Sequence, residues 1–183
     1  MVHLKNDAYS PKDATALLYR ARSLVEQNGL VVRDARVSRK YLEYDVSMPD
    51  EINENDVVKK MESISPLVSV ERVVERHIGK DEAIRLAISS FNDEKYWSAH
   101  ELLEGVWKQA EGTEKSIING IILVAAAFVH DQKDEPEICI SILRRALAKL
   151  ETGRGTYSGI DIDRLATNVV EIVNTGRIKR FAI

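Results

Sequence analysis

The hydrophobic positions of the first part of the chain follow two different periods. From Pro11 to Asn28 they recur every three or four residues, as on one face of a helix, and Ser10 before the proline is a typical helix start. Leu30–Val37 and Tyr41–Met48 are instead rich in β-branched and aromatic residues, and the second segment alternates apolar with polar positions. We therefore expect a helix followed by a β-hairpin that turns at Ser38-Arg39-Lys40.

The same two periods continue to residue 78. Asn53–Ile64 has helical spacing, Pro66–Glu75 is a valine-rich strand, and Val2–Lys5 is a possible leading strand. The resulting order predicts an α+β module, ferredoxin-like or similar, in which a small antiparallel sheet carries two helices on one face. Such a fold does not by itself determine a function.

Beyond residue 78 the strand pattern gives way to helical spacing. Five segments joined by short connections have this spacing: Asp81–Asn92, Lys95–Ala110, Thr113–Asp131, Glu135–Glu151 and Ile162–Thr175. We expect them to form an all-helical bundle. The sequence thus predicts two domains, an α+β module at residues 1–78 and a helical domain at residues 79–183.

Composition and charge narrow the class of protein. A hydrophobic share of 44% with 30% charged residues is typical of a globular chain with a core. The net charge of −3 is spread evenly, so general nucleic-acid affinity through a bulk basic surface has little support. The single cysteine, Cys139, cannot form an internal disulfide and is expected to be buried.

Two features favour a soluble, cytoplasmic protein. The N-terminal residues have no basic region followed by an apolar stretch, as a secretory signal would. The longest apolar run, Ile117–Val129, is shorter than the ~20 residues needed to cross a bilayer, so we expect a core helix there and no membrane partner.

The second helix of the helical domain carries the candidate chemistry. His100 and Glu104 lie one helical turn apart on the same side, at the border of the apolar face, where they can share a proton, a metal ion or a hydrogen bond. Ser116, Asn119 and His130 are the polar residues of the otherwise apolar third helix, and they fall within one sector of ~60° around its axis. Together these side chains define a candidate binding pocket, formed by His100, Glu101, Glu104, Trp107, Ser116, Asn119 and His130.

This constellation has two interpretations. A partly buried histidine beside a glutamate can be a structural pair, since pairing removes the cost of burying polar groups. Alternatively, His100, Glu104 and His130 could bind a divalent metal, although the spacing lacks the second histidine of a zinc protease helix. No catalytic residue can be assigned, and His100 and Glu104 remain the candidates.

Two tryptophans and a glycine suggest packing roles. Trp107 falls on the broad apolar arc of its helix and is expected to anchor the core, whereas Trp97 lies further round and is expected at a second interface. Gly120 in the third helix would let another helix approach closely.

The residues of this region resemble a known family. The similarity is to domain of unknown function 309 and covers roughly Asp81 to Leu150. It rests on Phe91-Asn92, Tyr96, Ala99-His100-Glu101, Leu103-Glu104, Trp107, Gly120, Leu123–Ala127 and His130. The resemblance implies an all-helical fold and a soluble protein, and it supplies no activity. Leu123 stands where family members typically have glutamine, so a pocket relying on that amide would be altered here.

Three functions fit the sequence. We favour a non-enzymatic binding or assembly protein acting through its helical domain, as a homo-oligomer or with a protein partner, because no nucleophile with its base, phosphate loop or complete metal set is present. No cofactor is then expected. The alternative is a metal-assisted hydrolase or related enzyme using His100, Glu104 and His130 with a divalent ion.

A third possibility is an RNA-binding accessory role for basic residues of the hairpin and the C-terminal part. These residues are Arg33, Arg36, Arg39, Lys40, Arg177, Lys179 and Arg180. Basic side chains at strand edges also discourage aggregation, which is the simpler explanation for the hairpin set.

Overall fold

The structure is a computed structural model that describes residues 1–25, 30–49, 52–72 and 78–183. The chain forms two compact units, one of Met1–Glu75 with Gln132–Asp134, the other of Arg76–Asp131 with Glu135–Ile183. We refer to them as the α+β unit and the helical unit and describe each by itself.

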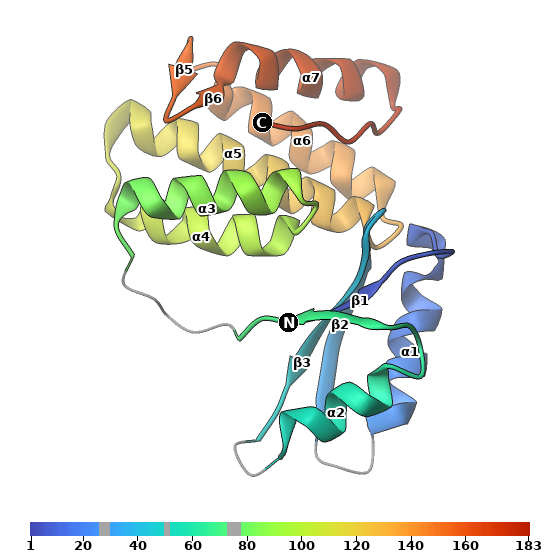
Figure 1. The fold of residues 1–183 in the computed structure, drawn as a ribbon. Coiled ribbons are helices and arrows are strands. Elements are labelled where there is room, and N and C mark those ends of the chain that lie inside the picture. Colours follow the sequence, from blue (N-terminus) through green and yellow to red (C-terminus); the bar gives the residue numbers. More distant parts are fainter. Residues whose placement is uncertain (26–29, 50–51, 73–77) are drawn as a thin grey trace. The chain divides into compact units, whose positions relative to one another are not determined.

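The α+β unit contains a four-stranded antiparallel sheet in the order β2-β3-β1-β4 (Figure 1). Its elements are β1 (Val2–Lys5), a 3-10 turn (Pro11–Asp13), α1 (Ala14–Val25), β2 (Val31–Val37), β3 (Tyr41–Ser47), α2 (Glu54–Met61) and β4 (Leu67–Val70). Side chains alternate between the two faces of a sheet along each strand. Leu4, Leu42 and Tyr44 lie on the same face, where they form one core with buried residues of α1 and α2. The predicted α+β class is confirmed.

Element boundaries in this unit differ in small ways from the expected ones. The first helix begins as a 3-10 turn at Pro11, where the Ser10 backbone N–H donates to the Asp13 carboxylate. Its predicted extension to Asn28 lies outside the described residues. The strand expected from Pro66 to Glu75 is only Leu67–Val70, and residues 73–75 are again outside the described part.

The helical unit consists of five helices, as predicted, among its described residues. They are α3 (Lys80–Asn92), α4 (Tyr96–Gln109), α5 (Gly112–Asp131), α6 (Pro136–Leu150) and α7 (Ile162–Thr175) (Figure 1). The core contains residues of all five, and α5 contributes nine buried positions. By length and composition alone α5 could cross a membrane, but 56% of its apolar window is buried, which also fits a central helix of a bundle.

A small ribbon between α6 and α7 was not expected from the sequence. Strands β5 (Thr156–Tyr157) and β6 (Ile160–Asp161) pair antiparallel across Ser158 and Gly159. Both turn residues have positive φ, 48° and 92°, as in the tight two-residue turns of hairpins. Strands of two residues are too short to show an alternating pattern, so periodicity could not predict them.

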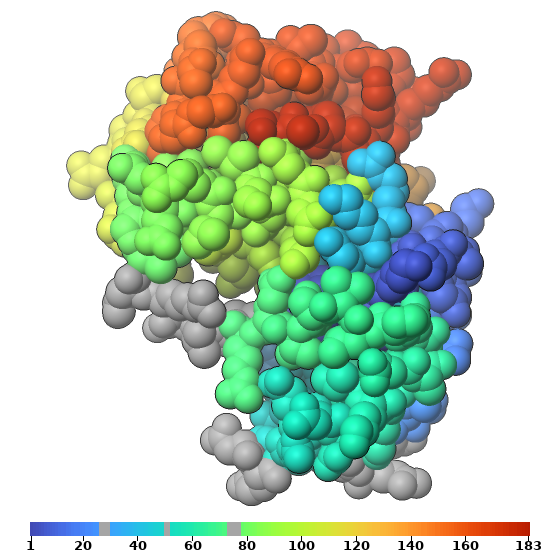
Figure 2. Space-filling view, viewed as in Figure 1, coloured from blue at the N-terminus to red at the C-terminus, as the bar shows by residue number. Residues whose placement is uncertain are grey.

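After α7 the chain reverses and packs back onto the bundle. Gly176 ends α7 in the left-handed conformation, with φ of 67°. Phe181 then contacts the rings of Phe91 and Phe128, and the Asn92 side chain bonds to both backbone groups of Ile183. We call residues 177–183 the tail segment. Figure 2 shows it in dark red between α7 and the helices α3 and α4.

Candidate functional site

Helix α4 places His100 and Glu104 at the edge of the core. Tyr96, Ala99 and Leu103 point into the bundle and are buried, whereas His100 and Glu104 are half-buried. The His100 Nε2 atom lies 3.3 Å from Glu104 Oε1, as the spacing of one helical turn predicts.

Trp97 and His100 form a stacked pair on the same helix. Their ring centroids are 5.4 Å apart and their planes differ by 13°. The Nδ1 atom of His100 is buried and has no hydrogen-bond partner within the described residues. The imidazole is thus positioned by the indole and by Glu104, and one ring nitrogen keeps its bonding capacity.

Glu101 completes a possible metal-binding group. Ligand atoms of His100, Glu101 and Glu104 all lie within 4.8 Å of one another. An imidazole nitrogen with two carboxylates suits zinc, manganese or iron. All three residues come from one helix, however, and carboxylate-rich sites in bundles usually draw ligands from several helices.

Trp107 lies one turn beyond Glu104 and is half-buried against the core. Its buried Nε1 atom has no acceptor among the described residues. The ammonium of Lys115, on α5, lies 4.7 Å from the ring centroid in a cation–π contact. Trp107 therefore packs on the core, as expected, while part of its surface remains accessible.

The remaining pocket candidates lie on α5. Ser116 and Asn119 are half-buried. His130, in the last turn, pairs through Nδ1 with the carboxylate of Glu135 and is not a member of the His100 group. The expected close approach at Gly120 is present, because a Cβ there would lie 2.7 Å from the Leu150 Cδ2 atom. Cys139 is buried, and burial, the largest cause, raises its pKa to about 12.

The basic residues considered for RNA binding differ in environment. Arg36 is 3% exposed and forms ion pairs with Glu43 and Asp34, and Arg33 donates to the Ser47 hydroxyl. Arg39 and Lys40 are exposed. In the tail segment, Arg180 is held by Glu94 and Asp131, while Arg177 and Lys179 are exposed.

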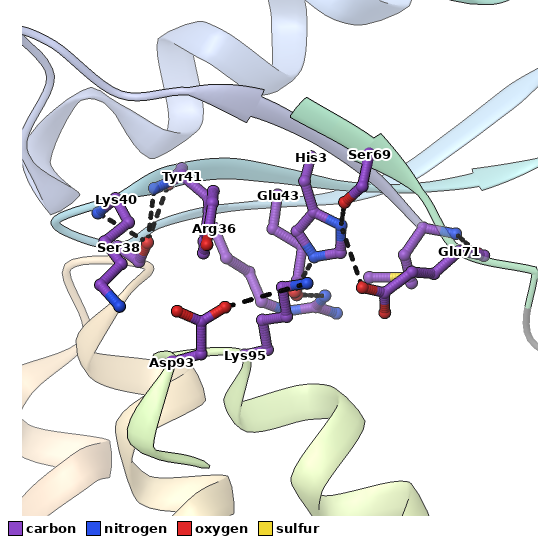
Figure 3. A network of polar contacts seen from close by, with 11 residues as sticks. His3, Arg36, Ser38, Lys40, Tyr41, Glu43, Ser69, Glu71, Asp93 and Lys95 are labelled. Atoms are coloured by element: carbon purple, nitrogen blue, oxygen red, sulfur yellow. Dashed lines mark hydrogen bonds and ion pairs between the residues drawn. The ribbon is translucent and has the colours of Figure 1, made fainter. Parts of the chain in front are cut away.

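A polar network on the sheet of the α+β unit was not foreseen from the sequence. His3 lies between Glu43 and Ser69 (Figure 3). Its Nε2 atom is 2.9 Å from Glu43 Oε2 and its Nδ1 atom is 3.4 Å from Ser69 Oγ. Arg36 donates to the other Glu43 oxygen at 2.7 Å. The order serine, histidine and glutamate superficially resembles a hydrolase triad.

Electrostatics keep Glu43 ionised within this network. Burial acts to raise the pKa of the carboxyl, but the hydrogen bond with His3 and the charge of Arg36 outweigh it, so the pKa lies below its usual range. The sequence feature that could have revealed this network is the alternation of apolar and polar residues along the strands. His3 and Glu43 are the polar members between apolar neighbours on β1 and β3, so they share the face opposite the helices.

Comparisons with known proteins match parts of the chain. A conserved hypothetical protein from Thermus thermophilus, known as a crystal structure, is 27% identical; the match covers 50% of this chain and 95% of that one, with a TM-score of 0.44. No curated protein matches the chain significantly. Residues 84–142, which include the whole of α4 and α5, match the model of the family described as domain of unknown function (DUF309).

Proposed function

We propose that this protein is a non-enzymatic binding and assembly module in which the α4 face of the helical unit docks a second copy of the chain. One observation carries the proposal: α4 presents two half-buried tryptophans, Trp97 and Trp107, on either side of His100 and Glu104. Tryptophan is enriched at interfaces and among the residues that dominate binding energy.

The charges on this face support a second copy as the partner. Glu101 and Glu104 are close to one another on α4, while Lys108 follows one turn later and Lys115 lies beside Trp107. A two-fold interface brings the same patch of both copies together, so a patch with both signs of charge can pair acidic with basic groups.

The α+β unit would add a second contact surface. Its βαββαβ order and its strand order β2-β3-β1-β4 support assigning it to the ferredoxin-like folds, which bind many different partners. We expect this assembly to act in the cytoplasm and without a cofactor.

Self-association of the full chain by sedimentation equilibrium tests the proposal. Glu101→Lys adds a positive charge to the α4 face at an exposed position, so it should weaken the dimer by about tenfold or more, since like charges facing each other are costly. Glu151→Lys makes the same change in net charge at the exposed end of α6 and should have no such effect. Equal dimer affinities in the two variants, or a chain that stays monomeric at every concentration, would contradict the proposal.

A divalent metal site, with the chain acting as a metal-assisted hydrolase, is the second candidate. It is favoured by the ligand atoms of His100, Glu101 and Glu104, which all lie within 4.8 Å of one another. Equilibrium dialysis against zinc and manganese would measure it. Such a site should lose its metal in His100→Ala and in Glu104→Ala, and it should keep the metal in His130→Ala because His130 pairs with Glu135. This pattern would establish the metal site in place of the structural pair.

RNA binding has no comparable support. Arg36 and Arg180 are held in ion pairs by neighbouring carboxylates, so two of the candidate cations are already neutralised.

A further inference from the structure

A cleft of about 250 Å³ lies in the helical unit between α7 and the tail segment. One wall is a single face of α7, at Arg164, Asn168, Glu171 and Ile172. The other wall is the tail segment, which runs back along α7 in Figure 1. The cleft is remote in sequence from α4 and is a separate site from the face discussed above.

Contacts with the helical bundle hold the tail segment, which forms this second wall, in place. Arg180 donates to Glu94 and Asp131, each at 2.9 Å, and Phe181 packs between aromatic rings of the core. These contacts fix the segment between Gly176 and Ile183, so the cleft is formed before any ligand arrives.

The charges lining the cleft are strongly positive for this protein. Arg164, Arg177 and Lys179 line it together with only one carboxylate, Glu171. Within the described part of the chain, none of these four side chains forms an ion pair. The cleft is thus locally positive in a chain whose net charge is −3. All three cations are exposed, so solvent screens most of their mutual repulsion, and an anion bound among them would offset the remainder.

Helix electrostatics do not account for this arrangement. A cation just beyond the end of a helix is favourable, which explains Arg177, next to the cap residue Gly176. Arg164 lies in the first turn of α7, where the helix dipole disfavours a positive charge. The carboxylates of Asp161 and Asp163 lie beside it in the sequence, but neither forms an ion pair with Arg164 among the described residues, so its guanidinium stays available to an anion.

We propose that this cleft binds the phosphate group of a small ligand. Two guanidinium groups offer paired donors that match phosphate oxygens, Lys179 adds a point charge and Asn168 an amide donor. The volume suits a compact molecule rather than a nucleic-acid strand. Phe181 provides a partly exposed apolar surface, and Glu171 can accept a hydrogen bond from a hydroxyl group of a phosphate ester.

Titration of the isotopically labelled full chain, followed by NMR, tests this assignment with inorganic phosphate and with glycerol 3-phosphate. We expect saturable shifts of the amides of Asn168, Arg177 and Lys179 at constant ionic strength. Tighter binding of glycerol 3-phosphate identifies the ligand as a phosphate ester, whereas equal or tighter binding of inorganic phosphate identifies free phosphate; both support the site. Shifts that do not saturate, or tighter binding of an RNA oligonucleotide without terminal phosphates, would overturn it.

Three variants and a control make the test specific. Arg164→Gln and Lys179→Gln should each weaken phosphate binding by about tenfold or more, because each removes a charge-assisted contact. Glu171→Gln should strengthen the binding of inorganic phosphate, since the variant removes the one negative charge among the residues lining the cleft. Arg144→Gln on the exposed side of α6 should leave the affinity unchanged. If Arg144→Gln weakens phosphate binding as much as Arg164→Gln does, or if Glu171→Gln weakens the binding of inorganic phosphate, the cleft is not the site. Circular dichroism confirms that each variant is folded.

Discussion

Gly120 on α5 packs closely against Leu150 at the end of α6. A Cβ added there would lie 2.7 Å from Leu150 Cδ2 and 3.2 Å from the Leu150 backbone nitrogen. We expect Gly120→Ala to lower the free energy of unfolding by about 1 to 3 kcal/mol, as overpacked cores do. Urea titration measures this change.

Gly105→Ala is the matched control for Gly120. Gly105 is an exposed helical position on α4 with nothing within 4 Å of an added Cβ. Alanine should stabilise the protein there by about 0.5 to 1 kcal/mol, because glycine lowers helix stability. Similar losses in both variants would show that the contact with Leu150 is not tight.

Arg180 joins three distant parts of the helical unit. It is 12% exposed and bonds to Glu94, 3% exposed, and to Asp131. Arg180→Met should lower the free energy of unfolding by about 3 to 5 kcal/mol, because buried carboxylates would remain without their cation. Adding Glu94→Gln to that variant should restore part of the loss. An Arg180→Met protein as stable as the wild type in urea would rule out this role.

The sheet of the α+β unit should depend on pH through Glu43. Its pKa in the folded chain lies below its ordinary value of 4.5. The unfolded chain therefore binds more protons, so this stabilisation is complete above pH 4.5 and is lost as the pH falls through the folded pKa.

Hydrogen exchange of the β1 and β3 amides, expressed as a free energy of opening, measures this dependence. We expect the value to fall below pH 4.5 in the wild type and in Glu62→Gln, an exposed control after α2. In Glu43→Gln the value should be lower at neutral pH and less sensitive to acid. The same pH profile in all three proteins would mean that Glu43 does not stabilise the sheet.

Sequence periodicity predicts the elements better than the contacts between them. Helix α7 is predicted correctly at both ends, because its apolar face repeats regularly and Gly176 stops it. Arg180, by contrast, is considered from the sequence only as one of the basic residues for RNA binding, although it pairs with Glu94, which is 86 residues away. The His3–Glu43 pair spans 40 residues. Local patterns contain no information about such pairings, so the tail, the cleft and the sheet network required the structure.

For the whole chain, the helical unit should fold without the α+β unit. It has its own core from five helices, and the contacts of the tail segment described above lie within it. A fragment of residues 79–183 should therefore give a mainly helical circular dichroism spectrum and a single cooperative urea transition. A fragment that is unfolded, or that shows mainly strand, would contradict the boundary near Gly79.

Native mass spectrometry of the purified full chain tests the central proposal most directly, since it reports assembly and bound metal together. If the α4 face docks a second copy and His100 and Glu104 form a structural pair, the main species has twice the chain mass of 20.6 kDa and carries no additional ion. A monomer whose mass includes about one divalent metal ion, lost in His100→Ala, would contradict the account and favour the metal-assisted enzyme.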